Sequence, residues 1–284
     1  MILYLRIGLN GPGTIITDMT AFLFCIFVQL LPTLGSIMLF GFLIAFCKKI
    51  FYNNCGDHAH IAVYATGLIG TPIHELSHAL FCVIFGHKIH KIKLFQMNSD
   101  DGVLGYVQHS YNPKNIYQRI GNFFIGIAPI LVISSILYLL ARILVPDLLE
   151  IISAKASEID PLKGLVSMFS GIGGIVGAVI LFSREIMWWV FIIVSAFLAL
   201  HMTLSGADIN GAKDGILFFV LTVVGANGIL AIVDMELLFN LTKIVMTMAG
   251  MLNLFLIISL IISTMLVVGS FVIKAGVKKI KIKK

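Results

Sequence analysis

Long apolar runs recur along almost the whole of this 284-residue chain, and they constrain its fold more than any other feature. Several of these runs reach the length of about 20 residues that an α-helix needs to cross the hydrocarbon core of a bilayer. Charged residues make up only 12% of the sequence, whereas a typical soluble domain contains about 25%. We therefore predict an all-α polytopic membrane protein with six to seven transmembrane helices.

The seven apolar segments lie at about 14–47, 61–86, 119–145, 164–182, 186–204, 216–233 and 238–273. Segment 164–182 is rich in glycine and is either a span or a re-entrant segment, so it decides between seven spans and six. Six spans place both the loop 87–118 and the C-terminal lysines in the cytoplasm, which satisfies the positive-inside rule better. We predict one domain over residues 1–284, with its core at 61–215 and a basic cytoplasmic tail at 274–284.

The only long polar stretch, residues 87–118, predicts a small β-hairpin directly after the second apolar segment. Partial alternation over His87–Phe95 is followed by a turn signal at Asn98–Gly102 and a returning strand at Val103–His109. The hairpin is either a plain surface element or an edge on which an extended peptide could pair. We expect its histidines, His87, His90 and His109, to be solvated or interfacial and not metal ligands, and the four cysteines of the chain to pack as apolar residues.

The second apolar segment contains the pattern His-Glu-x-x-His, formed by His74, Glu75 and His78. Residues i and i+4 share one face of a helix, so the two imidazoles can bind the same metal ion. Glu75 follows the first histidine and can reach a water on that ion as a general base. Ionisable groups at mid-membrane depth are costly unless they have a use, which favours a metal site over a chance match.

A catalytic zinc site needs a third protein ligand beside the two histidines and one open position. Asp208 is our candidate, because Gly206 and Gly211 flank it and let the backbone bring a carboxylate inward. The alternatives for the third position are Asp214, His201 and Glu236. His201 and Asn210 are also candidates to orient a ligand or to stabilise an oxyanion.

With these residues in place, the chain resembles the site-2-protease-like intramembrane zinc metalloproteases, the peptidase M50 group. The resemblance covers about residues 61–215 and is carried by His74-Glu75-Leu76-Ser77-His78-Ala79-Leu80, by Phe85-Gly86-His87-Lys88-Ile89 with the basic hairpin, and by Ala128-Pro129 in the next span. The third ligand of that group is an Asp in an Asp-Gly motif on a later helix. Here the corresponding stretch reads Asp208-Ile209-Asn210-Gly211, so the resemblance is to a divergent member.

The resemblance implies a zinc-dependent intramembrane endopeptidase, with Zn²⁺ held by His74, His78 and Asp208 and with Glu75 as the general base. The expected partners are the lipid bilayer and a membrane protein or peptide that serves as substrate. Two alternatives come from other classes: a catalytically silent membrane protein that binds a partner segment, and a metal transporter. The intact Glu75 argues against the first, and the scarcity of ionisable groups in the spans argues against the second.

The net charge of +6 comes from basic residues in short loops and in the tail, as membrane topology requires. We therefore expect no nucleic-acid partner. We expect a multi-pass protein of a prokaryotic cell membrane, and the sequence leaves its oligomeric state open.

Overall fold

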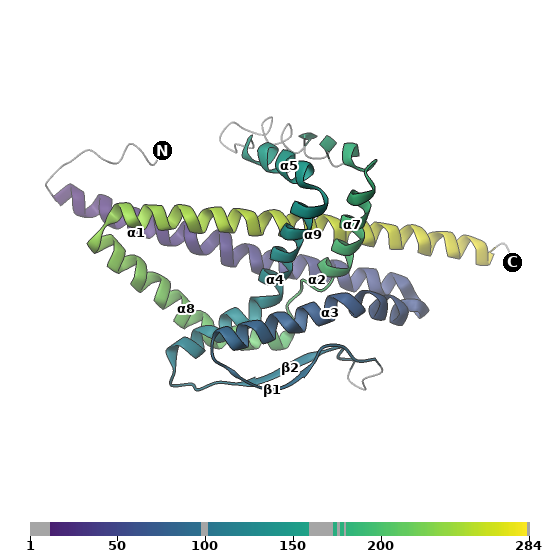
Figure 1. Ribbon diagram of the computed structural model, residues 1–284, viewed down its shortest axis with the longest axis horizontal. Helices are drawn as coiled ribbons and strands as arrows, with labels where there is room; N and C mark the ends of the chain where they lie inside the picture. The colour runs from purple at the N-terminus through teal and green to yellow at the C-terminus, as the bar shows by residue number, and fades with distance from the viewer. Residues whose placement is uncertain (1–11, 98–101, 159–172, 175–176, 179, 283–284) are drawn as a thin grey trace.

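The computed structural model describes residues 12–97, 102–158, 173–174, 177–178 and 180–282. The described chain is mostly helical and includes one two-stranded hairpin (Figure 1). This confirms the predicted helical class and the hairpin that follows the second apolar segment.

Four helical runs are long and apolar enough to cross a membrane: Met19–Ile84, Ile116–Leu144, Gly206–Val233 and Met235–Ala275. The predicted number of six to seven separate spans is therefore larger than the four candidate spans found among the described residues. The first two predicted spans fall within the single run Met19–Ile84, in which the chain reverses at Gly56, and helix α7 (Ile186–Ala199) has only 14 residues. At 1.5 Å per residue it is about 21 Å long, against a hydrocarbon core of about 30 Å. Most of the predicted segment 164–182 lies outside the described residues.

The first run begins with a long helix that has an irregular turn at its proline. Helix α1 (Pro12–Leu30) leads through a π-helical turn at Leu31–Gly35 into α2 (Ser36–Cys55). Pro32 has no N–H group and cannot continue the regular hydrogen bonding. The hydroxyl of Ser36 donates to the Pro32 carbonyl at 2.6 Å and satisfies it locally.

Helix α3 (Ala59–Ile84) returns alongside α2 and carries the histidine motif (Figure 1). The reversal occurs at Gly56, whose φ of +55° is a conformation that favours glycine. The Tyr52 and Thr66 hydroxyls, 2.7 Å apart, form a hydrogen bond that joins the two helices near this turn.

The hairpin starts directly after α3, where Gly86 has a φ of +69°. Strand β1 (Lys88–Lys93) pairs antiparallel with β2 (Tyr106–Ser110), with an irregularity between Ile89 and Lys91. Pairing continues towards the turn, since the Gln96 N–H donates to the Leu104 carbonyl at 2.7 Å. The hairpin lies along α3 in Figure 1.

Helix α4 (Ile116–Leu144) lies at the centre of the packing, and Ile130, Ile133 and Leu137 on it are fully buried. It packs closely against α8 (Gly206–Val233) because glycines lie at the crossing. A Cβ atom on Gly126 would lie 2.6 Å from the Asp208 carbonyl oxygen, and one on Gly215 would collide with the backbone of Phe123. These contacts fix where α8 begins relative to α4.

The remaining helices enclose this centre. Helix α5 (Pro146–Glu158) follows α4, and α9 (Met235–Ile282) is a single helix of 48 residues. Helix α9 is continuous through Gly250.

Candidate metal centre

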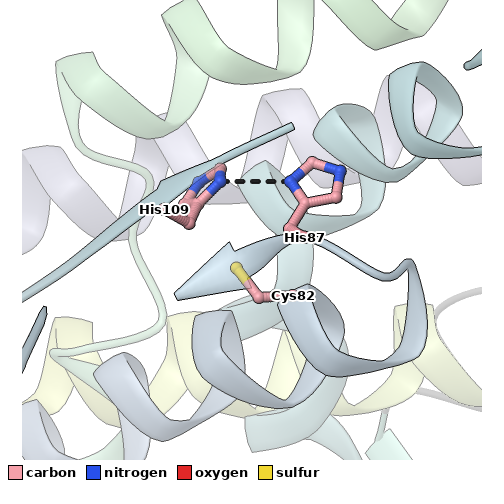
Figure 2. Close-up of side chains that lie close together, drawn as sticks. All are labelled: Cys82, His87 and His109. Carbon is pink, nitrogen blue, oxygen red and sulfur yellow. Dashed lines mark hydrogen bonds between the residues drawn. The ribbon is translucent and has the colours of Figure 1, made fainter. Parts of the chain in front are cut away.

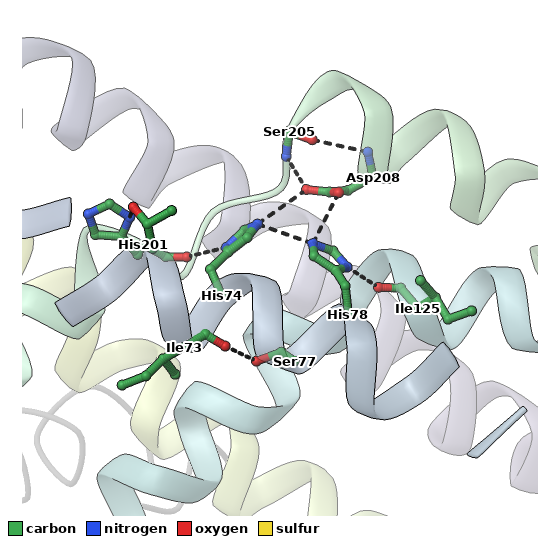
Figure 3. Close-up of polar contacts among 9 residues, drawn as sticks. Ile73, His74, Ser77, His78, Ile125, His201, Ser205 and Asp208 are labelled. Atoms are coloured by element: carbon green, nitrogen blue, oxygen red, sulfur yellow. Dashed lines mark hydrogen bonds and ion pairs between the residues drawn. The ribbon is translucent and has the colours of Figure 1, made fainter. Parts of the chain in front are cut away.

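Two histidine side chains from adjacent turns of α3 meet at their Nε2 atoms, which lie 3.2 Å apart (Figure 3). The Nδ1 of His74 donates to the His201 carbonyl at 2.8 Å, and the Nδ1 of His78 donates to the Ile125 carbonyl at 2.7 Å. A carbonyl only accepts, so each Nδ1 carries the proton and each Nε2 keeps a free lone pair. This arrangement prepares both imidazoles to bind one metal ion.

Asp208 reaches the same point from the first turn of α8. Its Oδ1 lies 3.3 Å from the Nε2 of His78, and its Oδ2 lies 3.7 Å from the Nε2 of His74. A capping box holds the residue: the Ser205 N–H donates to Oδ2 at 2.7 Å, and the Asp208 N–H donates to the Ser205 hydroxyl at 3.1 Å. The carboxylate is thus fixed by the start of its own helix as well as by the α4–α8 crossing.

The spacing of these donors fits one tetrahedral zinc ion. With zinc–ligand bonds of 2.0–2.1 Å, two tetrahedral ligand atoms lie about 3.3 Å apart. The pairs of donor atoms in this group lie 3.2, 3.3 and 3.7 Å apart. Two imidazoles and one carboxylate also form a donor set typical of catalytic zinc, which leaves a fourth position open.

A cavity of about 380 Å³ reaches one of the three donors, His74, and is also lined by Glu75, His201 and Lys48. Glu75 is 7% exposed, so its carboxyl group is held in a mostly dry environment. Hairpin residues Leu104 and Gly105 form another part of the wall. A Cβ atom on Gly105 would lie 2.8 Å from Cγ of Glu75, so a glycine is needed where the hairpin crosses the glutamate.

His201 is close to the cavity but is not one of the three convergent donors. Its ring packs directly over Gly70, where a Cβ atom would collide with it, and its Nδ1 lies 3.5 Å from the Thr71 hydroxyl. Its Nε2 is buried and has no hydrogen-bond partner among the described residues. The backbone of His201 orients His74, and the residue also lines the cavity.

Asp214 lies elsewhere and is fully engaged by other side chains. It accepts hydrogen bonds from the Tyr111 hydroxyl at 2.8 Å, from Arg119 at 2.9 Å and from Asn122 at 3.0 Å. The bond to this carboxylate raises the pKa of the Tyr111 phenol. Asp214 therefore ties α8 to α4 and to the segment after β2, away from the histidine pair.

The other two candidates also lie apart from the donors. Asn210 is exposed and accepts a hydrogen bond from Lys213 at 3.4 Å. Glu236 is exposed in the first turn of α9. Among the described residues, the group that brings metal-binding atoms together at the motif consists of His74, His78 and Asp208.

The expectation for the hairpin histidines was wrong for His87, which is only 6% exposed. It follows Gly86, whose left-handed conformation turns the chain back over the end of α3. Burial lowers the pKa of both His87 and His109. Sequence reasoning also missed Lys48 and Gly105 as cavity residues, because neither shows a local pattern that indicates a site.

Residues 67–157 match the model of a family described as "Putative zincin peptidase". The match includes His74, Glu75, His78 and the hairpin, and ends before Asp208. The family description points to a zinc metallopeptidase but not to the M50 group in particular. No curated protein and no solved structure matches this chain.

Proposed function

We propose that this protein is a zinc-dependent intramembrane endopeptidase that cleaves transmembrane or membrane-associated peptides. The proposal rests on one observation: His74, His78 and Asp208 converge at zinc-ligand spacing beside Glu75, on helices apolar enough to cross a membrane. The zincin peptidase match over residues 67–157 supports peptide hydrolysis rather than metal transport.

In this mechanism His74, His78 and Asp208 hold the metal ion. Zinc bound there supplies a Lewis acid that polarises the scissile carbonyl and lowers the pKa of water. Glu75, which lines the cavity next to the first ligand, takes a proton from the attacking water and passes it to the leaving amine. As a carboxylate, Glu75 accepts the proton from water, and as the resulting carboxylic acid it donates that proton to the amine.

His201 would stabilise the negative charge that develops on the substrate carbonyl. Its Nδ1 accepts from the Thr71 hydroxyl in this role, which leaves the proton on Nε2. That Nε2 has no partner among the described residues, but the atom is buried, so the His201 ring would have to rotate towards the cavity that the residue lines before it could donate. A donor held there stabilises an oxyanion more strongly than water does.

The substrate must reach the cavity as an extended chain, because a helix hides its own carbonyl groups in hydrogen bonds. Leu104 and Gly105 place the backbone of the hairpin at the cavity wall. Main-chain pairing with the hairpin would hold an unwound substrate segment beside Glu75.

The test uses detergent-purified full-length protein and a panel of fluorescence-quenched peptides, each with an apolar segment in its centre. We expect the zinc-loaded wild type to cleave some of them, and a zinc chelator to stop cleavage. Glu75→Gln should keep its zinc but lose at least the 10²–10⁴-fold contribution typical of a general acid–base group.

Wild-type cleavage that persists in Glu75→Gln would rule out the proposed mechanism. Zinc binding with peptide capture but no cleavage in either protein would favour a catalytically silent protein that binds a membrane segment.

A further inference from the structure

A second group of metal-binding side chains lies at the junction of α3 and the hairpin (Figure 2). Cys82 from α3, His87 from the turn and His109 from β2 each offer one ligand atom, and these atoms all lie within 4.8 Å of one another. Cys82 is fully buried and His87 nearly so. None of the three is part of the centre formed by His74, His78 and Asp208.

The local fold brings Cys82 and His87 together. The His87 N–H donates to the Cys82 carbonyl at 2.8 Å, and the Gly86 N–H donates to the Val83 carbonyl at 3.1 Å. With Gly86 in the left-handed conformation, these two bonds form a Schellman motif, which folds the chain back over the last turn of the helix. The motif places the His87 ring near the thiol one turn below it.

The hairpin brings the third residue. His109 pairs with Ile89 in the strand register, so β2 carries its imidazole back to the start of β1. The Nδ1 atoms of His87 and His109 then lie 3.1 Å apart. Figure 2 draws this contact as a dashed line. This separation is close to the value of about 3.3 Å expected for two ligands of one tetrahedral zinc ion.

The His87 ring is oriented as a metal-binding imidazole would be. Its Nε2 donates to the Gln118 carbonyl at 2.8 Å, so its Nδ1 carries the lone pair that faces His109 and Cys82. The Tyr111 ring stacks on it with centroids 5.3 Å apart and planes 18° apart. A carbonyl and a stacked ring thus fix this imidazole from two sides.

We propose that Cys82, His87 and His109 bind a second metal ion, zinc by preference, which fastens the hairpin to the end of α3. One sulfur and two nitrogen ligands select zinc over magnesium or calcium, which prefer oxygen. On binding, the Cys82 thiol releases its proton to solvent as the zinc–sulfur bond forms. Water completes the coordination, because the group contains three protein ligands.

This ion would act on the cavity through the hairpin. The same hairpin carries Leu104 and Gly105 at the cavity wall beside Glu75. An ion that holds β2 to α3 would therefore fix one wall of the cavity. The site does not depend on the proposed peptidase activity, since its ligands are a separate set.

The first measurement is the zinc content per chain of full-length purified protein. We expect two zinc ions in the wild type, and one each in Cys82→Ala, in His109→Ala and in His74→Ala. His90→Ala is the matched control, because His90 belongs to the same hairpin and bonds the Ser110 hydroxyl at 2.7 Å outside the group. It should keep both ions.

Cobalt distinguishes the two centres, because only the second contains sulfur. Co²⁺-loaded wild type and His74→Ala should show a sulfur-to-cobalt charge-transfer band in the near ultraviolet, and Cys82→Ala and His109→Ala should lack it. Hydrogen exchange of the β2 amides should become faster in Cys82→Ala and stay unchanged in His90→Ala.

Wild-type zinc content in both Cys82→Ala and His109→Ala, with no sulfur band in the cobalt protein, would overturn the proposal. The 3.1 Å contact would then be an ordinary hydrogen bond between two neutral imidazoles. His109→Gln, a milder change on a half-buried strand residue, keeps the test valid if Cys82→Ala fails to fold.

Discussion

At the scale of single residues, Asp208 has two roles that can be separated by substitution. Its carboxylate faces the Nε2 atoms of His74 and His78, and it also accepts the Ser205 N–H in the capping box. An amide in its place still accepts that hydrogen bond, but it is neutral and binds zinc poorly. The two roles therefore predict different behaviour for the Asn and Ala variants.

We expect Asp208→Asn to lose most of its zinc at the motif while α8 stays capped and the protein keeps nearly wild-type thermal stability. Asp208→Ala should lose the zinc and about 1 kcal/mol of stability, because the Ser205 N–H loses its acceptor in the capping box. Zinc content by elemental analysis and thermal unfolding in detergent measure the two effects. Because the second proposed centre also holds zinc, both are best measured in a Cys82→Ala background.

Asp214→Asn is the matched control on the same helix. It weakens the bonds to Tyr111 and Arg119 but should leave the zinc in place. Zinc lost from Asp214→Asn and retained in Asp208→Asn would move the third ligand to Asp214.

Sequence reasoning reached the pair of histidines because the i, i+4 rule depends only on the helix that contains them. It chose Asp208 over Asp214 from the flanking glycines, which do not fix where either carboxylate lies in the fold. The choice depends on the α4–α8 crossing, where Asp214 meets Arg119 and Asn122 while Asp208 meets the histidines. Sequence reasoning failed for His87, since the burial of that ring depends on a turn geometry that the residue type alone does not reveal.

At the scale of elements, the close approach of α4 and α8 positions the proposed centre. Gly215 permits it, since any side chain there would collide with the backbone of α4 at Phe123. Gly225 lies ten residues, or nearly three turns, further along α8, with nothing within 4 Å of its Cβ position. The same substitution should therefore have opposite effects at the two positions.

We expect Gly215→Ala to lower the free energy of unfolding by about 1–3 kcal/mol through overpacking, and to weaken zinc binding as Asp208 shifts. Gly225→Ala should be neutral or stabilising by up to about 1 kcal/mol, because alanine is the better helix former. Unfolding midpoints in detergent show whether each substitution stabilises or destabilises the protein. Equal stability of both variants would mean that the α4–α8 contact tolerates separation.

The elements themselves were partly predictable. The hairpin and the irregular turn at Pro32 follow from local chemistry, namely alternation with a turn signal and a missing N–H group. The number of spans could not be predicted from the sequence, because apolar composition shows only how long a membrane helix could be. It does not show that α7 would be short or that α9 would run without a break.

At the scale of the whole molecule, a buried polar cluster connects helices far apart in the chain. Gln29 on α1 donates to the Asn227 carbonyl group at 2.9 Å and to the Thr242 hydroxyl at 2.7 Å, and Asn227 donates back to Gln29 at 2.9 Å. Asn227 is 1% exposed. These bonds join α1, α8 and α9 at a point away from both proposed metal centres.

A double-mutant cycle with Gln29→Met and Asn227→Leu tests this connection. We expect each single variant to be destabilised and the coupling energy to be about 0.6–1.7 kcal/mol, the range for such bonds in membrane proteins. Zinc content should not change, because none of the metal donors belongs to the cluster. Additive effects of the two substitutions would mean that the amide pair contributes nothing to the helix assembly.

The length of α9 has a consequence for how the molecule is seated in a bilayer. Its apolar part, Met235–Ala275, covers 41 residues, which is about 61 Å at 1.5 Å per residue. Even a tilt of about 40°, the upper end of the usual range, leaves it longer than the hydrocarbon core. Two lysines, Lys243 and Lys274, are separated along this helix by about 46 Å, close to the full thickness of a bilayer with its headgroups. Their ammonium groups can reach opposite headgroup layers, so this helix would set both the depth and the tilt of the whole assembly.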